Sequence, residues 1–230
     1  MTKTKLDQMD VSALFKCPTF ARTARNGETF LHPADWPETY IRNDFIGGLL
    51  RTKGNGEGQY PDPYLHWIES VFGREPETME ICSRYVKADG YSTKYTVDIN
   101  PRFEPTFCTD AQTMAGVPPL KVKRIRADPP YNEQTARKMY CTKLPDFYKL
   151  LEAGSKFLEV GGLYFLLLGM HNYQINVERL GLRRIGLVAL AVVPNYEMRA
   201  CNIFYKFAEP EQARTTAEGY QGQLDTEASL

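Results

Sequence analysis

The tetrapeptide Asp128-Pro129-Pro130-Tyr131 constrains the folding of this chain more than any other segment does. The preceding residues, 122–127, have the character of a β-strand, and that strand has to stop at the aspartate. Prolines hold φ at about −65° and have no N–H to continue a hydrogen-bonded ladder. The sequence therefore predicts a strand whose C-terminal end presents a carboxylate, a rigid turn and an aromatic ring.

This group of side chains suits one chemical problem, the attack of an exocyclic amino group of a nucleobase on an electrophile. Such an amine is a poor nucleophile, because its lone pair is delocalised into the ring of a nucleobase. Asp128 and the Pro129 carbonyl can accept its two hydrogens, while Tyr131 offers a face on which the base can stack. The alternative is an Asp-Pro turn followed by an ordinary core tyrosine. Chance would produce the tetrapeptide in roughly a few per thousand chains of this length, so the functional interpretation is favoured if a cofactor site is also present.

The bulk composition limits the class of protein. A chain of 230 residues with 43% hydrophobic residues and a formal net charge of zero predicts one globular domain, in which any nucleic-acid contact comes from a local patch. The five cysteines are scattered and lack a Cys-x-x-Cys pair, and the three histidines suit no zinc site, so we expect reduced thiols and no metal. The N-terminus lacks a signal region, and the apolar runs are far shorter than the about 20 residues of a membrane helix. These features predict a soluble, cytoplasmic protein without membrane contact.

The order of the expected elements predicts the fold class. Helices are expected from residue 35 to about 49, from 62 to 73 and around 147–158, the last ended by Gly161-Gly162. Strands are expected over residues 79–82, 95–98, 106–109, 122–127 and 163–168, and then over 185–193 and 198–207 as an antiparallel hairpin. Parallel strands joined by helices predict a doubly wound α/β sheet. Residues 1–30 are expected to form an irregular arm and 208–230 a disordered tail.

Acidic residues recur where these strands end. Glu80, Asp98, Asp110 and Asp128 lie within or directly after four successive expected strands. In an open α/β sheet, ligands bind at the carboxyl ends of the strands, near the point where the strand order reverses. We therefore expect these carboxylates to belong to one site.

In this order, the segments resemble the S-adenosylmethionine-dependent methyltransferases of the seven-stranded, Rossmann-like class. More narrowly, they resemble the amino-methyltransferases that act on adenine in DNA through an Asp-Pro-Pro-Tyr motif. The resemblance covers residues 31–207, which are expected to form the catalytic domain. It implies S-adenosylmethionine as cofactor, DNA as partner and N6 of a flipped-out adenine as the methyl acceptor.

The resemblance also implies roles for individual residues. Asp128, Pro129, Pro130 and Tyr131 would form the catalytic motif. Asp98 would accept the ribose hydroxyls of the cofactor, and Asp110 would contact its adenine amino group. The other positions implied to lie at the cofactor are His32, Pro33, Glu80, Cys82, Ser83, Arg84, Ile99 and Ala111.

Two segments depart from the family pattern. The loop after the first strand usually carries Gly-x-Gly, whereas this chain has Cys82-Ser83-Arg84. Either Ser83 and Arg84 hold the cofactor carboxylate by side chain, or affinity is reduced. The segment of the fourth strand, residues 121–126, carries four cations, and we therefore expect only residues 125–128 to be buried.

No inserted recognition domain follows Tyr131, so sequence recognition would be short, low, or supplied by a homodimer or a partner subunit. The candidates for polynucleotide contact are Arg137, Lys138, Tyr140, Lys143, Arg179, Arg183 and Arg184, although charges of this kind more often form a solvated face. An RNA base or a glutamine amide poses the same chemical problem as adenine. A degenerate, non-catalytic subunit that binds nucleic acid is the remaining alternative.

Overall fold

The computed structural model describes residues 22–23, 29–30, 42–46, 60, 62–82, 84, 93–140, 142–169, 177–192 and 197–210. His32, Pro33, Ser83, residues 54–58 and residues 211–230 lie outside the described residues, so the predictions made for them stay predictions. Within the segment expected to be an irregular arm, two short strands, β1 (Arg22–Thr23) and β2 (Thr29–Phe30), pair antiparallel.

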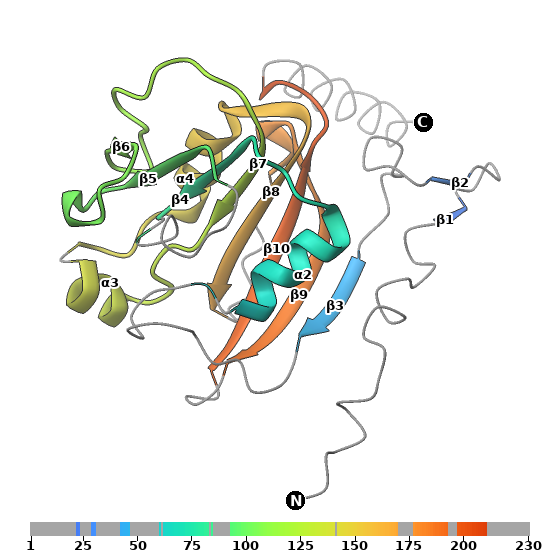
Figure 1. Ribbon diagram of the computed structural model, residues 1–230, viewed down its shortest axis with the longest axis horizontal. Coiled ribbons are helices and arrows are strands. Elements are labelled where there is room, and N and C mark those ends of the chain that lie inside the picture. Colours follow the sequence, from blue (N-terminus) through green and yellow to red (C-terminus); the bar gives the residue numbers. More distant parts are fainter. Residues whose placement is uncertain are drawn as a thin grey trace, which may run out of the picture.

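One mixed sheet organises the described part of the chain (Figure 1). Its strands lie in the order β3-β9-β10-β8-β7-β4-β5-β6. Their bounds are β3 Arg42–Ile46, β4 Thr78–Ile81, β5 Tyr95–Asp98, β6 Phe107–Cys108, β7 Val122–Ala127, β8 Leu158–Gly169, β9 Leu182–Val192 and β10 Glu197–Lys206. Only β10 runs antiparallel to its neighbours, β8 and β9. The predicted doubly wound, methyltransferase-like α/β sheet with a C-terminal antiparallel hairpin is therefore confirmed, and β3 extends its seven strands by an eighth.

Side-chain alternation along β8 builds a core on each face of the sheet. Leu163, Phe165 and Leu167 pack on one face with helix α2 (Asp62–Phe72), which lies across the sheet in Figure 1. Tyr164 and Leu166 pack on the other face with helix α4 (Phe147–Ser155). Because both faces are covered, β8 is a continuously apolar strand, as predicted.

The fourth strand of the prediction, β7, is buried over more of its length than expected. Arg124 and Arg126 are 5% and 1% exposed, and only Lys123 of the strand is open to solvent. Arg124 donates to the Phe72 and Gly73 carbonyls at the end of α2, at 3.0 and 2.8 Å. Those carbonyls lack intrahelical donors, so the guanidinium replaces water there. The prediction that only residues 125–128 are buried was wrong, because these cations have buried partners.

One element type and one helix end also differ from the prediction. The segment expected to be a helix from residue 35 to 49 contains strand β3, which pairs in parallel with β9 from Arg42↔Gly186 to Ile46↔Leu190. Helix α4 ends at Ser155, and β8 begins at Leu158, so Gly161-Gly162 lies within a strand rather than at a helix end. Gly161 has φ +92°, and a Cβ on Gly162 would lie 2.8 Å from the Lys123 carbonyl. The glycines accommodate the register shift between β7 and β8.

Helix α3 (Glu133–Tyr140) follows the Asp-Pro-Pro-Tyr segment directly.

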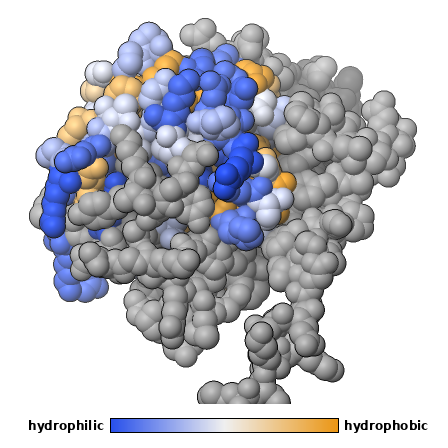
Figure 2. All heavy atoms as spheres, viewed as in Figure 1, coloured by the Kyte–Doolittle hydropathy of each residue, from blue (hydrophilic) through white to orange (hydrophobic). Residues whose placement is uncertain are grey.

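On the face seen in Figure 2, the hydrophobic atoms of the described residues are scattered among hydrophilic ones instead of forming one patch. Among the described residues, no helix combines the length and apolar character that crossing a membrane requires.

Candidate active site

A pocket lies at the carboxyl ends of β4, β5, β6 and β7. Its empty space, which is open to solvent, measures about 460 Å³. The sheet reverses its order between β4 and β7, since β5 and β6 continue on one side and β8 on the other. The pocket therefore occupies the place where doubly wound sheets bind ligands. Its lining residues are Cys82, Asp98, Ile99, Asp110, Ala111, Gln112, Pro130, Thr142, Lys143, Pro145 and Leu150.

Asp98 closes β5 and is only 2% exposed. Its Oδ2 accepts from the Arg84 N–H at 3.1 Å and its Oδ1 from the Asn100 N–H at 2.9 Å. Burial raises the pKa of Asp98, and these two backbone donors oppose that change. Each carboxylate oxygen has a further acceptor position, so the side chain can still bind a ligand hydroxyl.

The described residues of the turn directly after β4, Cys82 and Arg84, take a glycine-like conformation although neither is glycine. Cys82 has φ 58° and Arg84 has φ 42°, values in the left-handed region that most side chains avoid. The Arg84 N–H that this turn presents is the one that binds Asp98. Non-glycine residues in this region cost roughly 1–3 kcal/mol each and cluster at functional sites. The departure from Gly-x-Gly therefore changes the residues of this turn but preserves its left-handed backbone.

Asp110, directly after β6, is tied to the loop before α4. Its Oδ1 accepts from the Gln112 N–H at 2.9 Å, and Gln112 Oε1 accepts from the Asp146 N–H at 2.8 Å. Ala111 is buried beside it, and Ile99, at the mouth of the pocket, is 47% exposed. The structure thus brings together five of the predicted cofactor residues: Cys82, Asp98, Ile99, Asp110 and Ala111.

Glu80 and Arg84 do not line this pocket. Glu80 is fully buried and forms an ion pair with Arg126, while it accepts from the Tyr60 hydroxyl at 3.1 Å and the Thr93 hydroxyl at 3.2 Å. The Arg84 guanidinium lies over the Phe103 ring, 5.7 Å from its centroid. Glu80 thus has a structural partner in place of a ligand, and Arg84 contributes its backbone.

The catalytic motif lies beside the pocket, and Pro130 lines it. Asp128 is half-buried, and its Oδ1 forms an ion pair with Arg199 near the start of β10. Arg199 is 8% exposed and also donates from Nη2 to the Leu167 carbonyl at 3.3 Å. Its guanidinium carbon lies 5.0 Å from the centroid of the Tyr131 ring. Arg199 therefore connects the carboxylate and the aromatic ring of the motif.

Sequence reasoning missed Arg199. Because β10 runs antiparallel to β8, its first residues lie at the edge where the parallel strands end, and Arg199 pairs with Gly169 there. A cation at the start of the last strand was the available signal, but it points to the site only when the direction of that strand is considered.

The two basic groups lie at different edges of the sheet. Lys143 lines the pocket, and Arg137 and Lys138 lie on α3 just after the motif. Arg183 and Arg184 are at the start of β9, opposite Tyr205 and Phe204, so they lie at the far edge from Asp128. Arg179 belongs to the short 3-10 helix (Glu178–Leu180) just before that strand. Only the first group is close to the candidate site.

Comparison with known proteins gives structural likeness alone. Neither a family model nor a curated protein matches the chain. Among solved structures, TrmN from Thermus thermophilus is 14% identical with a TM-score of 0.45 over 62% of this chain and 48% of its own. A TehB-like SAM-dependent methyltransferase from Corynebacterium glutamicum is 13% identical with a TM-score of 0.43, over 66% and 90%. An S-adenosylmethionine-dependent methyltransferase from Clostridium acetobutylicum is 10% identical with a TM-score of 0.39, over 64% and 99%. At TM-scores below 0.5, these likenesses assign no function to the chain, which spans about half the length of TrmN.

Proposed function

We propose that this protein transfers the methyl group of S-adenosylmethionine to an exocyclic amino group, most specifically N6 of adenine in DNA. One observation carries the proposal: a single pocket at the switch point of the sheet joins Asp98, Asp110 and the Pro130 of the Asp-Pro-Pro-Tyr motif. A nucleoside-type cofactor and an amine-activating motif would therefore lie side by side.

The residues of the pocket fit such a cofactor. Asp98 would accept the ribose hydroxyls with the acceptor positions that Arg84 and Asn100 leave unused. Ile99, Ala111 and Leu150 give the pocket apolar walls suited to an adenine ring. When bound, the cofactor supplies an electrophilic methyl group on a sulfonium centre.

The chain's own residues would prepare the amine. Asp128 Oδ1 is held by Arg199, so the other carboxylate oxygen would accept one amino hydrogen, and the Pro129 carbonyl would accept the second. The Arg199 guanidinium lies over one face of Tyr131, so a base would stack on the other face. Most of the rate increase would come from orientation, because the electrophile is already activated.

Nucleic acid as substrate is favoured by the position of α3. The first turn after the catalytic motif leads into this helix, which exposes Arg137 and Lys138 at the edge that contains the pocket. Lys143 adds a third cation at the pocket itself. Phosphate contacts of this kind would position a strand without reading its sequence.

The proposal is tested by methyl transfer from radiolabelled S-adenosylmethionine to duplex DNA, RNA and a glutamine-containing protein in parallel. We expect DNA to be labelled on adenine and Asp128→Ala to lower the rate by at least about 100-fold, since it removes a positioned acceptor. Glu178→Ala, an exposed acid on the short 3-10 helix before β9, far from the motif, is the matched control and should change the rate little. Labelling of RNA or protein alone would identify another substrate class. Undiminished transfer by Asp128→Ala would contradict the assigned role.

A non-catalytic subunit would behave differently in calorimetry. Titration with S-adenosylmethionine is expected to show one site per chain, and no binding would leave only the interpretation as a degenerate subunit. Binding that Asp98→Ala leaves unchanged would place the cofactor elsewhere.

A further inference from the structure

We infer that Arg199 determines the specificity of the proposed reaction by donating its Nε–H to an acceptor atom next to the amine being methylated. The inference rests on the proposed function and deepens it. It selects amines that neighbour a ring nitrogen, and adenine is the substrate that fits best.

The guanidinium of Arg199 is only partly used. One nitrogen, Nη2, donates both to Asp128 Oδ1 and to the Leu167 carbonyl. Nε is shielded from water, yet none of the residues that the structure describes offers it an acceptor. A buried N–H without an acceptor is destabilising, so a substrate atom that accepts from Nε would recover that cost.

The unused donor lies in the middle of the motif. It belongs to the same planar group that binds the Asp128 carboxylate and lies over the Tyr131 ring. One guanidinium therefore carries the donor, Nε–H, and also binds the acceptor, the Asp128 carboxylate, so the two lie next to each other. Because the other contacts fix the guanidinium, this donor and this acceptor keep a constant separation.

A donor beside an acceptor complements a ligand edge that offers the opposite pair. Adenine has such an edge on both sides of its amino group, since N6–H donates and either N1 or N7 accepts. Asn and Gln side chains read adenine through the same acceptor–donor pair. Asp128 and Arg199 would divide that task between a carboxylate and a guanidinium, which adds charge to both hydrogen bonds.

The consequence is discrimination against amines without a neighbouring acceptor. A simple alkylamine would leave Nε–H buried and unpaired in the complex, which lowers transition-state binding. Adenine in which a carbon replaces the accepting ring nitrogen would suffer the same loss, although its amino group is unchanged.

The test compares the wild-type protein and Arg199→Lys on DNA duplexes that carry adenine, 1-deazaadenine or 7-deazaadenine at the mapped methylation site. Adenine and the analogue that reacts more slowly with the wild type form a cycle with the two proteins. We expect the wild-type protein to lose about 10- to 100-fold in kcat/KM on one of the two analogues. Arg199→Lys keeps a cation for Asp128 but lacks the fixed second donor. It should lose a similar factor on adenine and nothing further on that analogue. Arg74→Lys, an exposed arginine before β4, is the matched control and should keep the wild-type pattern.

The wild-type series stands even if Arg199→Lys folds poorly, which thermal unfolding and cofactor titration would reveal. Equal kcat/KM on adenine and both deaza analogues overturns the inference while leaving the proposed methyl transfer intact. Losses that simply multiply in the cycle also overturn it, because the variant and the analogue would then remove different interactions. A wild-type protein that methylates no nucleic acid removes the proposed function itself.

Discussion

Arg126 and Glu80 form an ion pair between β7 and β4 in which the side chains are 2% and 0% exposed. Arg126 Nη2 also reaches the Thr93 hydroxyl at 3.2 Å, and Tyr60 donates to the other oxygen of Glu80. The pair lies two residues before Asp128 on β7. The pair therefore links β7, which leads into the Asp-Pro-Pro-Tyr motif, to β4, which leads into the turn at Cys82.

Breaking this pair should be costly. Glu80→Gln keeps the shape of the side chain but leaves the Arg126 charge buried without a counter-charge. We expect the free energy of unfolding, measured with urea, to fall by about 3–5 kcal/mol. Glu133→Gln, which breaks the exposed pair with Arg137, serves as control and should change stability little. A Glu80→Gln protein as stable as the wild type would mean that Arg126 finds water or another acceptor.

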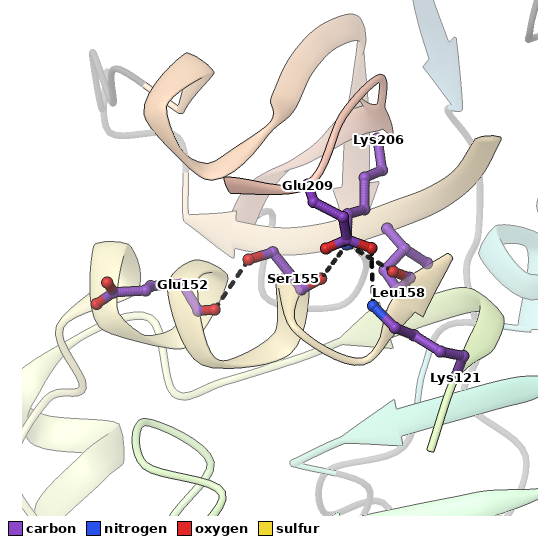
Figure 3. Close-up of polar contacts among 6 residues, drawn as sticks. All are labelled: Lys121, Glu152, Ser155, Leu158, Lys206 and Glu209. Carbon is purple, nitrogen blue, oxygen red and sulfur yellow. Dashed lines mark hydrogen bonds and ion pairs between the residues drawn. The ribbon is translucent and has the colours of Figure 1, made fainter. Parts of the chain in front are cut away.

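Lys206 makes stability depend on pH in the alkaline range. It is fully buried at the end of β10 and donates to the Ser155 and Leu158 carbonyls at 2.8 and 2.7 Å, as Figure 3 shows. Burial lowers the pKa of Lys206, against the opposing effect of Glu209. The folded protein then binds fewer protons than the unfolded chain between the folded pKa and about 10.5, so this contribution rises with pH in that window.

Lys206→Met should remove this dependence. The difference in unfolding free energy between wild type and Lys206→Met is expected to shift in favour of the wild type as pH rises from 8 towards about 10.5. Lys156→Met, at the exposed C-terminal cap of α4, is the control and should give a difference that stays flat. A difference that falls with pH would mean that Glu209 outweighs burial and raises the pKa of Lys206.

The sequence was sufficient to predict features of the fold that depend on residues close to one another along the chain. The strand ends at Asp98 and Ala127 match the prediction residue for residue, because apolar patterning and turn residues act locally. The hairpin between β9 and β10 was predicted for the same reason. Residues at or just after strand ends, among them Asp98, Asp110 and Pro130, line the candidate pocket.

Features that depend on distant partners were not predictable in this way. Arg124 was expected outside the buried part of its strand because its partners, the Gly73 and Phe72 carbonyls, are 51 and 52 residues away in the chain. Residues 42–46 have helical apolar spacing, but they pair with β9, which lies far along the sequence. Arg199 could not be assigned to the site from the sequence, because its place there depends on the direction of β10 and on its contact with Asp128, 71 residues away.

The described cysteines should differ strongly in reactivity. Cys108 is exposed, whereas Cys201 is fully buried against the Tyr64 hydroxyl at 3.2 Å, and burial raises the pKa of Cys201 to about 12. Burial also raises the pKa of Cys82, which lines the pocket. Because the thiolate is the reactive form, iodoacetamide at pH 8 should label Cys108 before Cys82 and Cys201, the other two described cysteines, in the native protein. Peptide mass spectrometry measures the order, and early labelling of Cys201 would show that β10 opens readily.

Asp98 provides the most direct test of the cofactor pocket. Asp98→Asn keeps the size of the side chain and one acceptor oxygen, but it loses the charge and half of the acceptor capacity. We expect calorimetry to show S-adenosylmethionine and S-adenosylhomocysteine binding about 10- to 100-fold more weakly, because hydrogen bonds from the ribose to a charged group are lost. Asp146→Asn is the matched control, since Asp146 also accepts backbone N–H groups, at the start of α4, but does not line the pocket. If both variants bind alike, the ribose does not contact Asp98. If Asp98→Asn alone also lowers the unfolding temperature without ligand, the Arg84 and Asn100 hydrogen bonds contribute to folding as well as to the site.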